Sequence, residues 1–154
     1  MEFSHSVQIK ATPQTIFNIY ADVNNWSIWD KDVELSSIEG EFKTGAIGEL
    51  KPKGAPKSKI FFTEVIKDKS FTTLGKLPLC KMYFEHTINI KDENTTTVTH
   101  TIKFFGFLSP IFGRLIGNGI KKNLPDVLEG LKIQAVANKS LEKEQVRTAD
   151  NSSF

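Results

Sequence analysis

The longest regular pattern in the chain is residues 80–107, CKMYFEHTINIKDENTTTVTHTIKFFGF. Apolar and polar side chains alternate on both sides of residues 92–94, which predicts two antiparallel β-strands joined by a three-residue turn. With that turn, the two residue numbers of each cross-strand pair add up to 186. His86 then lies directly opposite His100, with Cβ atoms about 4.5–5.5 Å apart.

Both histidines fall on the apolar face of their strands, and the apolar face should be the inner one. Their neighbours on that face are Cys80, Met82, Phe84, Ile88 and Ile90 in the first strand and Val98, Ile102 and Phe104 in the second. A turn of even length would place one of the two apolar faces outside, so the pattern itself favours the three-residue turn.

Two neutral imidazoles in an apolar interior could orient a ligand oxygen, or act as general acid and base near neutral pH. They could equally be structural, hydrogen-bonded to each other or to a buried water. A metal site needs a third ligand. Glu64 would supply it only if the strand at residues 60–66 turned that side chain toward the histidines. Both faces of that strand are apolar, so the sequence leaves open which of them points inward. We therefore predict neither a metal nor another cofactor.

Outside this hairpin, apolar and polar side chains alternate along residues 2–10, which predicts a first strand. Thr12 is a natural N-cap before Pro13, so a short helix should follow. The apolar stripe of that helix consists of Ile16, Phe17 and Tyr20. A second short helical turn carries Trp26 and Trp29 on one side, where they either pack the helices onto the sheet or shape a pocket mouth.

Residues 33–107 contain only strand and turn signals, enough for about six more strands. Ser109-Pro110 then begins a long amphipathic helix, with Ser109 as its N-cap and a kink expected near Lys122 because of Pro125.

This order predicts an α+β, helix-grip fold: an antiparallel sheet of about seven strands packed on a long C-terminal helix, with two short helices after the first strand. Residues 1–140 should form a single domain. Residues 141–154 lose the apolar stripe and should form a frayed or disordered tail.

Several short motifs resemble the polyketide cyclase/dehydrase family of the START-like (SRPBCC) superfamily over roughly residues 3–135. They are Ala11-Thr12-Pro13, Asp22…Trp26…Trp29, Gly40…Gly45…Gly48, Glu64-Val65 and Leu124-Pro125…Leu128…Leu131-Lys132. The resemblance implies a strongly curved sheet wrapped around the C-terminal helix, with a deep and mostly apolar cavity between them. Members bind lipids, sterols, polyketides or plant hormones, and a minority catalyse cyclisation or dehydration without a universal catalytic residue.

Because the lining of the cavity would select the ligand, the inward side chains are the candidate ligand-binding residues. They are Trp26, Trp29, Met82, Phe84, His86, His100, Ile102, Phe104, Phe112 and Ile116. Gly113, Gly117 and Gly119 leave helix backbone uncovered, which could admit a ligand against it.

Three functions are compatible with this pattern. The first is binding of an apolar, lipid- or polyketide-like small molecule. The second is a cyclase or dehydratase that uses His86 and His100 as acid and base. The third is a protein- or membrane-surface helper that uses the apolar residues 104–117 as an interface. Whether the chain is an enzyme stays open.

Composition excludes several classes. The 154 residues carry a net charge of only +2, too small to predict a nucleic-acid partner. One cysteine, Cys80, excludes an intrachain disulfide, and its inward position predicts an inert thiol. No secretory signal or membrane-spanning run is visible, so a cytoplasmic location is expected, with the oligomeric state open. The twelve Phe should be shared between core and cavity.

Overall fold

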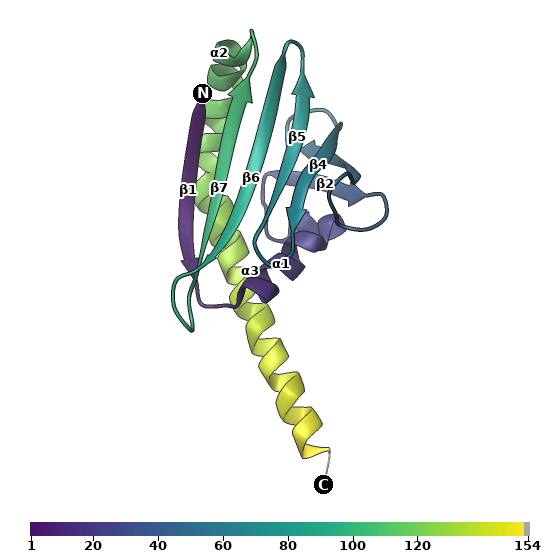
Figure 1. Cartoon of the computed structure of the whole chain (residues 1–154), viewed down its shortest axis with the longest axis vertical. Helices are drawn as coiled ribbons and strands as arrows, with labels where there is room; N and C mark the ends of the chain where they lie inside the picture. Colours follow the sequence, from purple (N-terminus) through teal and green to yellow (C-terminus); the bar gives the residue numbers. More distant parts are fainter. Residues whose placement is uncertain (153–154) are drawn as a thin grey trace.

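The computed structural model describes residues 1–152 as a seven-stranded antiparallel sheet in the order β1-β7-β6-β5-β4-β3-β2. A long helix crosses one face of the sheet and extends well beyond it (Figure 1). The strands are β1 (Glu2–Ile9), β2 (Val33–Ile38), β3 (Ile47–Pro52), β4 (Ser58–Ile66), β5 (Ser70–Leu77), β6 (Cys80–Ile90) and β7 (Thr96–Phe105). The helices are α1 (Pro13–Ala21), the 3₁₀ segment η1 (Val23–Ile28), α2 (Ser109–Phe112), the π-helical segment η2 (Gly113–Gly117) and α3 (Asn118–Asn151). The predicted α+β helix-grip fold is confirmed.

The register of the central hairpin is as predicted. His86 pairs with His100 across β6 and β7, and the ladder continues from Lys81–Phe105 at one end to Ile90–Thr96 at the other. The turn at residues 92–94 is closed by the amide of Asn94, which donates to the Asp92 carboxylate. This register fixes which side chains of both strands face α3.

The first helix also begins as predicted. The Thr15 amide donates to Oγ1 of Thr12 over 3.2 Å, and Pro13 occupies the first turn. A Pro there costs no hydrogen bond because the first amides of a helix lack intrahelical partners. The cap aims the apolar stripe of α1 into the interior, where Ile16 and Tyr20 have no exposed surface.

A β-bulge explains why β4 looked apolar on both faces. The β4–β5 register shifts between Phe62 and Glu64. Phe62 therefore faces the interior before the bulge and Val65 faces it afterwards, since both pair with inward residues of β5. Glu64 turns outward, and the Nζ of Lys76 covers the outward ring of Phe61 at 4.7 Å.

The C-terminal helical region differs from the prediction. Ser109 is the first residue of α2 and does not cap it. α3 runs through Pro125 as α-helix, and the π-helical segment η2 comes directly before it; a kink near Lys122 stays a prediction. Residues 141–151, expected to fray, are helical with exposed side chains; their fraying in solution stays a prediction.

The interior has two unequal parts. The larger cluster lies beside α1 and η1, where aromatic side chains fill the space between sheet and helix. The half-buried Phe42, from the loop between β2 and β3, seals it against Phe17, Phe62 and Phe71, with ring centroids 5.3–5.4 Å apart. The smaller cluster lies beside α2. Its buried members are Cys80, Ile102, Phe104 and Leu124.

Candidate functional site

All three histidines of the chain lie in one row across neighbouring strands. His5 of β1 pairs with His100 of β7, and His100 pairs with His86 of β6. The rings of His86 and His100 are 4.4 Å apart between centroids and nearly perpendicular. Both are buried, whereas His5 lies on the edge strand and is exposed. The predicted pair is therefore present in the middle of the concave face.

The sequence did not predict the closest polar partner of this pair, Tyr20. Its hydroxyl lies 2.8 Å from Nε2 of His100, and the whole residue is buried. The sequence did contain a signal for this contact, because Tyr20 is the one residue in the apolar stripe of α1 whose side chain ends in a polar group. A phenol in a buried helix face needs a hydrogen-bond partner.

Aromatic rings enclose the three polar groups. The ring of Phe71 stacks on His86 at 3.9 Å and 5° between planes, and Phe84 lies at 5.3 Å from the same imidazole. Trp29 lies 6.4 Å from His100. Trp26 donates from Nε1 to the Tyr20 carbonyl over 2.9 Å, so it packs η1 against α1. The polar cluster is therefore walled by apolar surface.

Three buried polar atoms at this cluster have no hydrogen-bond partner among residues 1–152: Nε1 of Trp29, Nδ1 of His86 and Nδ1 of His100. A buried polar group without a partner costs about 1–3 kcal/mol, and such groups are uncommon in folded proteins. The rings of all three residues lie 5.5–5.9 Å from the ring of Tyr20, so these atoms are the candidate hydrogen-bonding groups for a small molecule or water that enters here.

The electrostatics keep this cluster uncharged at neutral pH. Burial lowers the pKa of His86 from its ordinary value of 6.5 to about 3, only partly offset by the nearby backbone carbonyls of Phe71 and Phe84, neither of which forms a hydrogen bond of good geometry with Nδ1. Burial, and then repulsion from the other two histidines, lowers the pKa of His100 well below 6.5. Burial raises the pKa of Tyr20 well above 10. The cluster therefore offers neutral donors and acceptors.

The described residues offer no metal site. No group of three or more His, Cys, Asp or Glu side chains within residues 1–152 could hold an ion. Glu64, the third ligand considered from the sequence, faces away from the histidines because of the bulge in β4.

Inward side chains toward α2 are less completely packed. Met82 and Phe84 on the central strand β6 are only half-buried, and so is Phe112, which packs in the same smaller cluster; Ile116 of η2 is half-buried too. Because accessible surface requires room for a water-sized probe, some space reaches the concave face at this end of the sheet. Ile102 and Phe104, in contrast, are fully buried.

The helix glycines do not supply that space. A Cβ on Gly113 would meet the side chain of Met1, and one on Gly117 would lie 3.1–3.2 Å from the rings of Phe3 and Phe104. The expectation that these two glycines leave backbone open to a ligand is wrong, because the first residues of β1 cover them. Gly119 has open space beside it but is exposed on the outside of α3.

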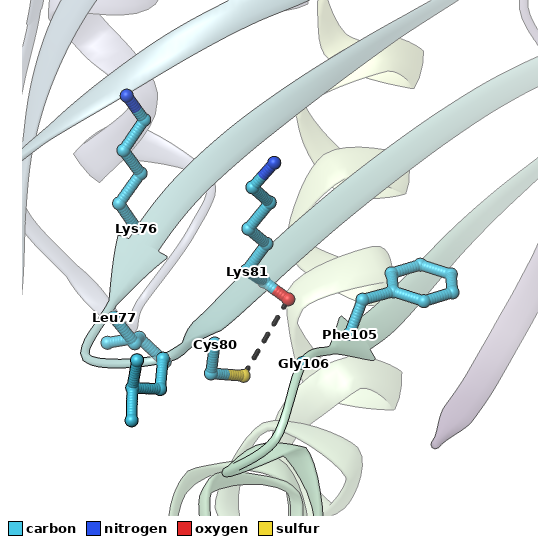
Figure 2. A pocket seen from close by; sticks show the side chains of 7 residues that line it. Lys76, Leu77, Cys80, Lys81, Phe105 and Gly106 are labelled. Carbon is cyan, nitrogen blue, oxygen red and sulfur yellow. Dashed lines mark hydrogen bonds between the residues drawn. The ribbon is translucent and has the colours of Figure 1, made fainter.

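Cys80 lies at the same end and contributes no nucleophile. Its thiol is buried, and burial raises its pKa. Its Sγ donates to the Lys81 carbonyl over 3.8 Å (Figure 2). The inward, buried position of Cys80 is as predicted, and a disfavoured thiolate is what an inert thiol requires.

Comparison with known proteins identifies the family. The model of the family described as "Polyketide cyclase / dehydrase and lipid transport" matches residues 1–135. The chain belongs to this family. No curated protein matches the sequence significantly.

Solved structures share the fold of this family member. The Zhui aromatase/cyclase from Streptomyces sp. R1128 is 15% identical, with a TM-score of 0.68 over 88% of this chain and 93% of its own. A START superfamily protein from Mycobacterium smegmatis is 17% identical, with a TM-score of 0.67 over 86% and 97%. The di-domain ARO/CYC BexL from the BE-7585A biosynthetic pathway is 13% identical, with a TM-score of 0.70 over 87% of this chain, which spans 46% of BexL.

Proposed function

We propose that this family member binds an uncharged, largely apolar small molecule between the sheet and α3, with one oxygen of the ligand at the buried polar cluster. The observation that carries the proposal is the set of three unpaired polar atoms on Trp29, His86 and His100. A ligand hydroxyl or carbonyl oxygen placed among them would satisfy buried groups that the fold leaves without partners.

The ligand should be neutral because the cluster is neutral. An anionic ligand would have to leave water without meeting a cation, since the lowered pKa values keep both imidazoles uncharged at pH 7. A hydroxyl or carbonyl group can instead donate or accept as the tautomers require.

The apolar part of the ligand should extend toward α2. The half-buried Met82, Phe84, Phe112 and Ile116 line this direction, and the opposite direction is filled by the larger core cluster. Of the other residues expected to bind ligand, we assign Ile102 and Phe104 to the floor of the same space. Trp26 is assigned to packing.

Catalysis as a cyclase or dehydratase is the weaker candidate. Acid–base catalysis by His86 and His100 works best when their pKa values lie near the operating pH, and both are far below it. The aromatase/cyclase neighbours share the fold at 13–15% identity, which carries no activity to this chain.

Intrinsic fluorescence tests the binding proposal, because Trp26 and Trp29 are the two tryptophans of the chain and both lie at the site. Titration with 1-decanol at pH 7.5 should change the emission saturably, and sodium decanoate should bind at least tenfold more weakly. A Tyr20→Phe, His100→Phe variant should lose preference for the alcohol, whereas His5→Gln, on the exposed edge, should keep it. Saturable binding of neither probe, or equal binding of both, would contradict the proposal.

A further inference from the structure

The end of the molecule beside α2 exposes an unusual number of large apolar side chains, which we call the apolar tip. Its members are Leu79 (71% exposed), Phe105 (55%), Phe107 (86%), Ile111 (58%) and Leu115 (76%). Scattered exposed apolar residues are ordinary, but a contiguous group marks a contact surface.

These residues come from separate parts of the chain that meet at the α2 end of the sheet. The Leu108 amide donates to the Leu79 carbonyl over 3.2 Å, which ties the turn between β5 and β6 to the link between β7 and α2. Leu79 and Phe105 line the same open hollow of about 480 Å³ (Figure 2). Ile111 lies in α2 and Leu115 lies one helical turn later in η2, at the end of the sheet where Figure 1 shows α2.

The two chain segments that form the apolar tip carry charge of one sign, although the acidic Glu2 begins the neighbouring strand β1, opposite Lys103. Residues 76–84 and 104–125 hold five basic residues and no acidic one, leaving fifteen basic and eighteen acidic residues in the rest of the chain. Lys76 and Lys81 are direct cross-strand partners and extend side by side in Figure 2. Neither they nor Arg114 forms an ion pair within residues 1–152.

Folding alone does not favour this arrangement. Leu79 adopts φ +50°, a conformation that a branched side chain takes at a cost, and its side chain remains in water. Like charges directly opposite on neighbouring strands also destabilise a sheet. Both costs would be offset by a partner that is apolar at the tip and anionic around it.

We propose that the apolar tip docks this protein onto a bilayer that contains anionic phospholipid. Phe107, Leu79 and Leu115 would enter the acyl region while Lys76, Lys81 and Arg114 meet lipid phosphates. A bilayer with anionic lipid fits this surface because exposed apolar side chains lie next to basic side chains that form no ion pair within residues 1–152.

Docking in this way would place the incompletely packed end of the interior against the membrane. Met82 and Phe112 lie behind the tip, and both are half-buried members of the smaller cluster. If the proposed ligand binding holds, an apolar ligand could pass between bilayer and protein without crossing water. The docking proposal itself rests on the tip alone and is tested without any ligand.

Flotation with extruded vesicles tests the proposal. We expect binding to vesicles of 30% phosphatidylserine in phosphatidylcholine, much weaker binding to pure phosphatidylcholine, and loss of binding as salt rises. A Lys76→Gln, Lys81→Gln variant should bind roughly thirtyfold more weakly, at about fivefold per lysine. A Phe107→Ser, Leu115→Ser variant should lose at least about tenfold because apolar insertion is removed.

The matched control changes residues at the other end of β6, away from the apolar tip. Ile90 is 74% exposed and Lys91 is its exposed neighbour, so Ile90→Ser, Lys91→Gln removes one apolar and one basic side chain from the opposite end. That variant should bind vesicles as the parent does. Absence of binding to anionic vesicles, or equal losses in control and tip variants, would overturn the proposal. A dimer in sedimentation velocity that Phe107→Ser abolishes, in a protein that ignores vesicles, would assign the tip to self-association instead.

Discussion

Acidification should destabilise the protein through its two buried histidines. The folded state holds His86 and His100 neutral because both rings are buried, with the pKa of His86 at about 3 and that of His100 well below 6.5. In the unfolded chain both titrate near 6.5. Between these values the unfolded state binds more protons than the folded state, so stability falls as pH is lowered.

The size of the effect follows from linkage. Each histidine contributes stability that is fully present above pH 6.5 and is lost at about 1.4 kcal/mol per pH unit below it. From pH 7 to pH 5 the loss is about 2 kcal/mol for each ring, or about 4 kcal/mol for the pair.

One half-buried carboxyl works in the opposite direction. Burial raises the pKa of Asp30 from 3.8 to about 6, only partly offset by its hydrogen bond from the Asp32 amide. The folded state therefore holds a proton there that the unfolded state releases, and acidification from pH 7 to pH 5 stabilises the fold by about 1 kcal/mol. The expected net loss of stability is about 2–3 kcal/mol.

Urea unfolding followed by tryptophan fluorescence at pH 7, 6 and 5 measures this loss directly. His86→Gln and His100→Gln should each reduce the pH-dependent loss by about 2 kcal/mol, whatever they do to the stability at pH 7. His5→Gln, on the exposed edge of the same row, should leave the loss almost unchanged. A stability that stays flat between pH 7 and pH 5, or a loss that persists in the double histidine variant, would refute the reasoning.

Two further predictions concern side-chain and backbone contacts that the sequence did not reveal. Tyr20→Phe should destabilise by about 1–3 kcal/mol, because it leaves Nε2 of His100 buried without a partner, and Tm should fall by roughly 2–12 °C in a thermal scan, at about 2–4 °C per kcal/mol for a chain of this size; an unchanged Tm would show that the bond is not formed. Gly130→Ala should cost about 1–3 kcal/mol in urea unfolding because its Cβ would strike the Trp29 carbonyl, whereas Gly119→Ala, with open space, should stabilise by about 0.5–1 kcal/mol. Equal effects of the two alanines would contradict that contact.

The strand hairpin was predictable because its determinants are local. Alternation over β6 and β7 and the length of one turn specify the register, and hence the His86–His100 pair, without knowledge of the rest of the chain. The start of α1 at Thr12 and Pro13 is equally local.

The rest of the site depends on contacts between distant segments. Tyr20 reaches His100 across 80 positions of sequence, and no periodicity within α1 specifies which strand it meets. The bulge between Phe62 and Glu64 inverts the faces of β4 and is not encoded by alternation. Gly113 and Gly117 looked open from the sequence, but Met1 and Phe3 cover them, and that contact needs the sheet to place β1 beside η2.

Within residues 1–152, no helix is long and apolar enough to cross a membrane. Membrane contact at the apolar tip is proposed as surface docking, in which a few side chains of the tip enter the bilayer. Ligand binding and docking are separable, because Lys76→Gln, Lys81→Gln alters the tip while leaving the polar cluster intact.

The most direct test of the central claim is a long-range ¹H–¹⁵N spectrum of the three imidazoles, recorded with and without a neutral apolar alcohol. The account predicts shifts of the ring nitrogens of His86 and His100, with His5, exposed on the edge strand, unchanged as an internal control. Unmoved signals from His86 and His100 at ligand saturation, or a shift confined to His5, would contradict it.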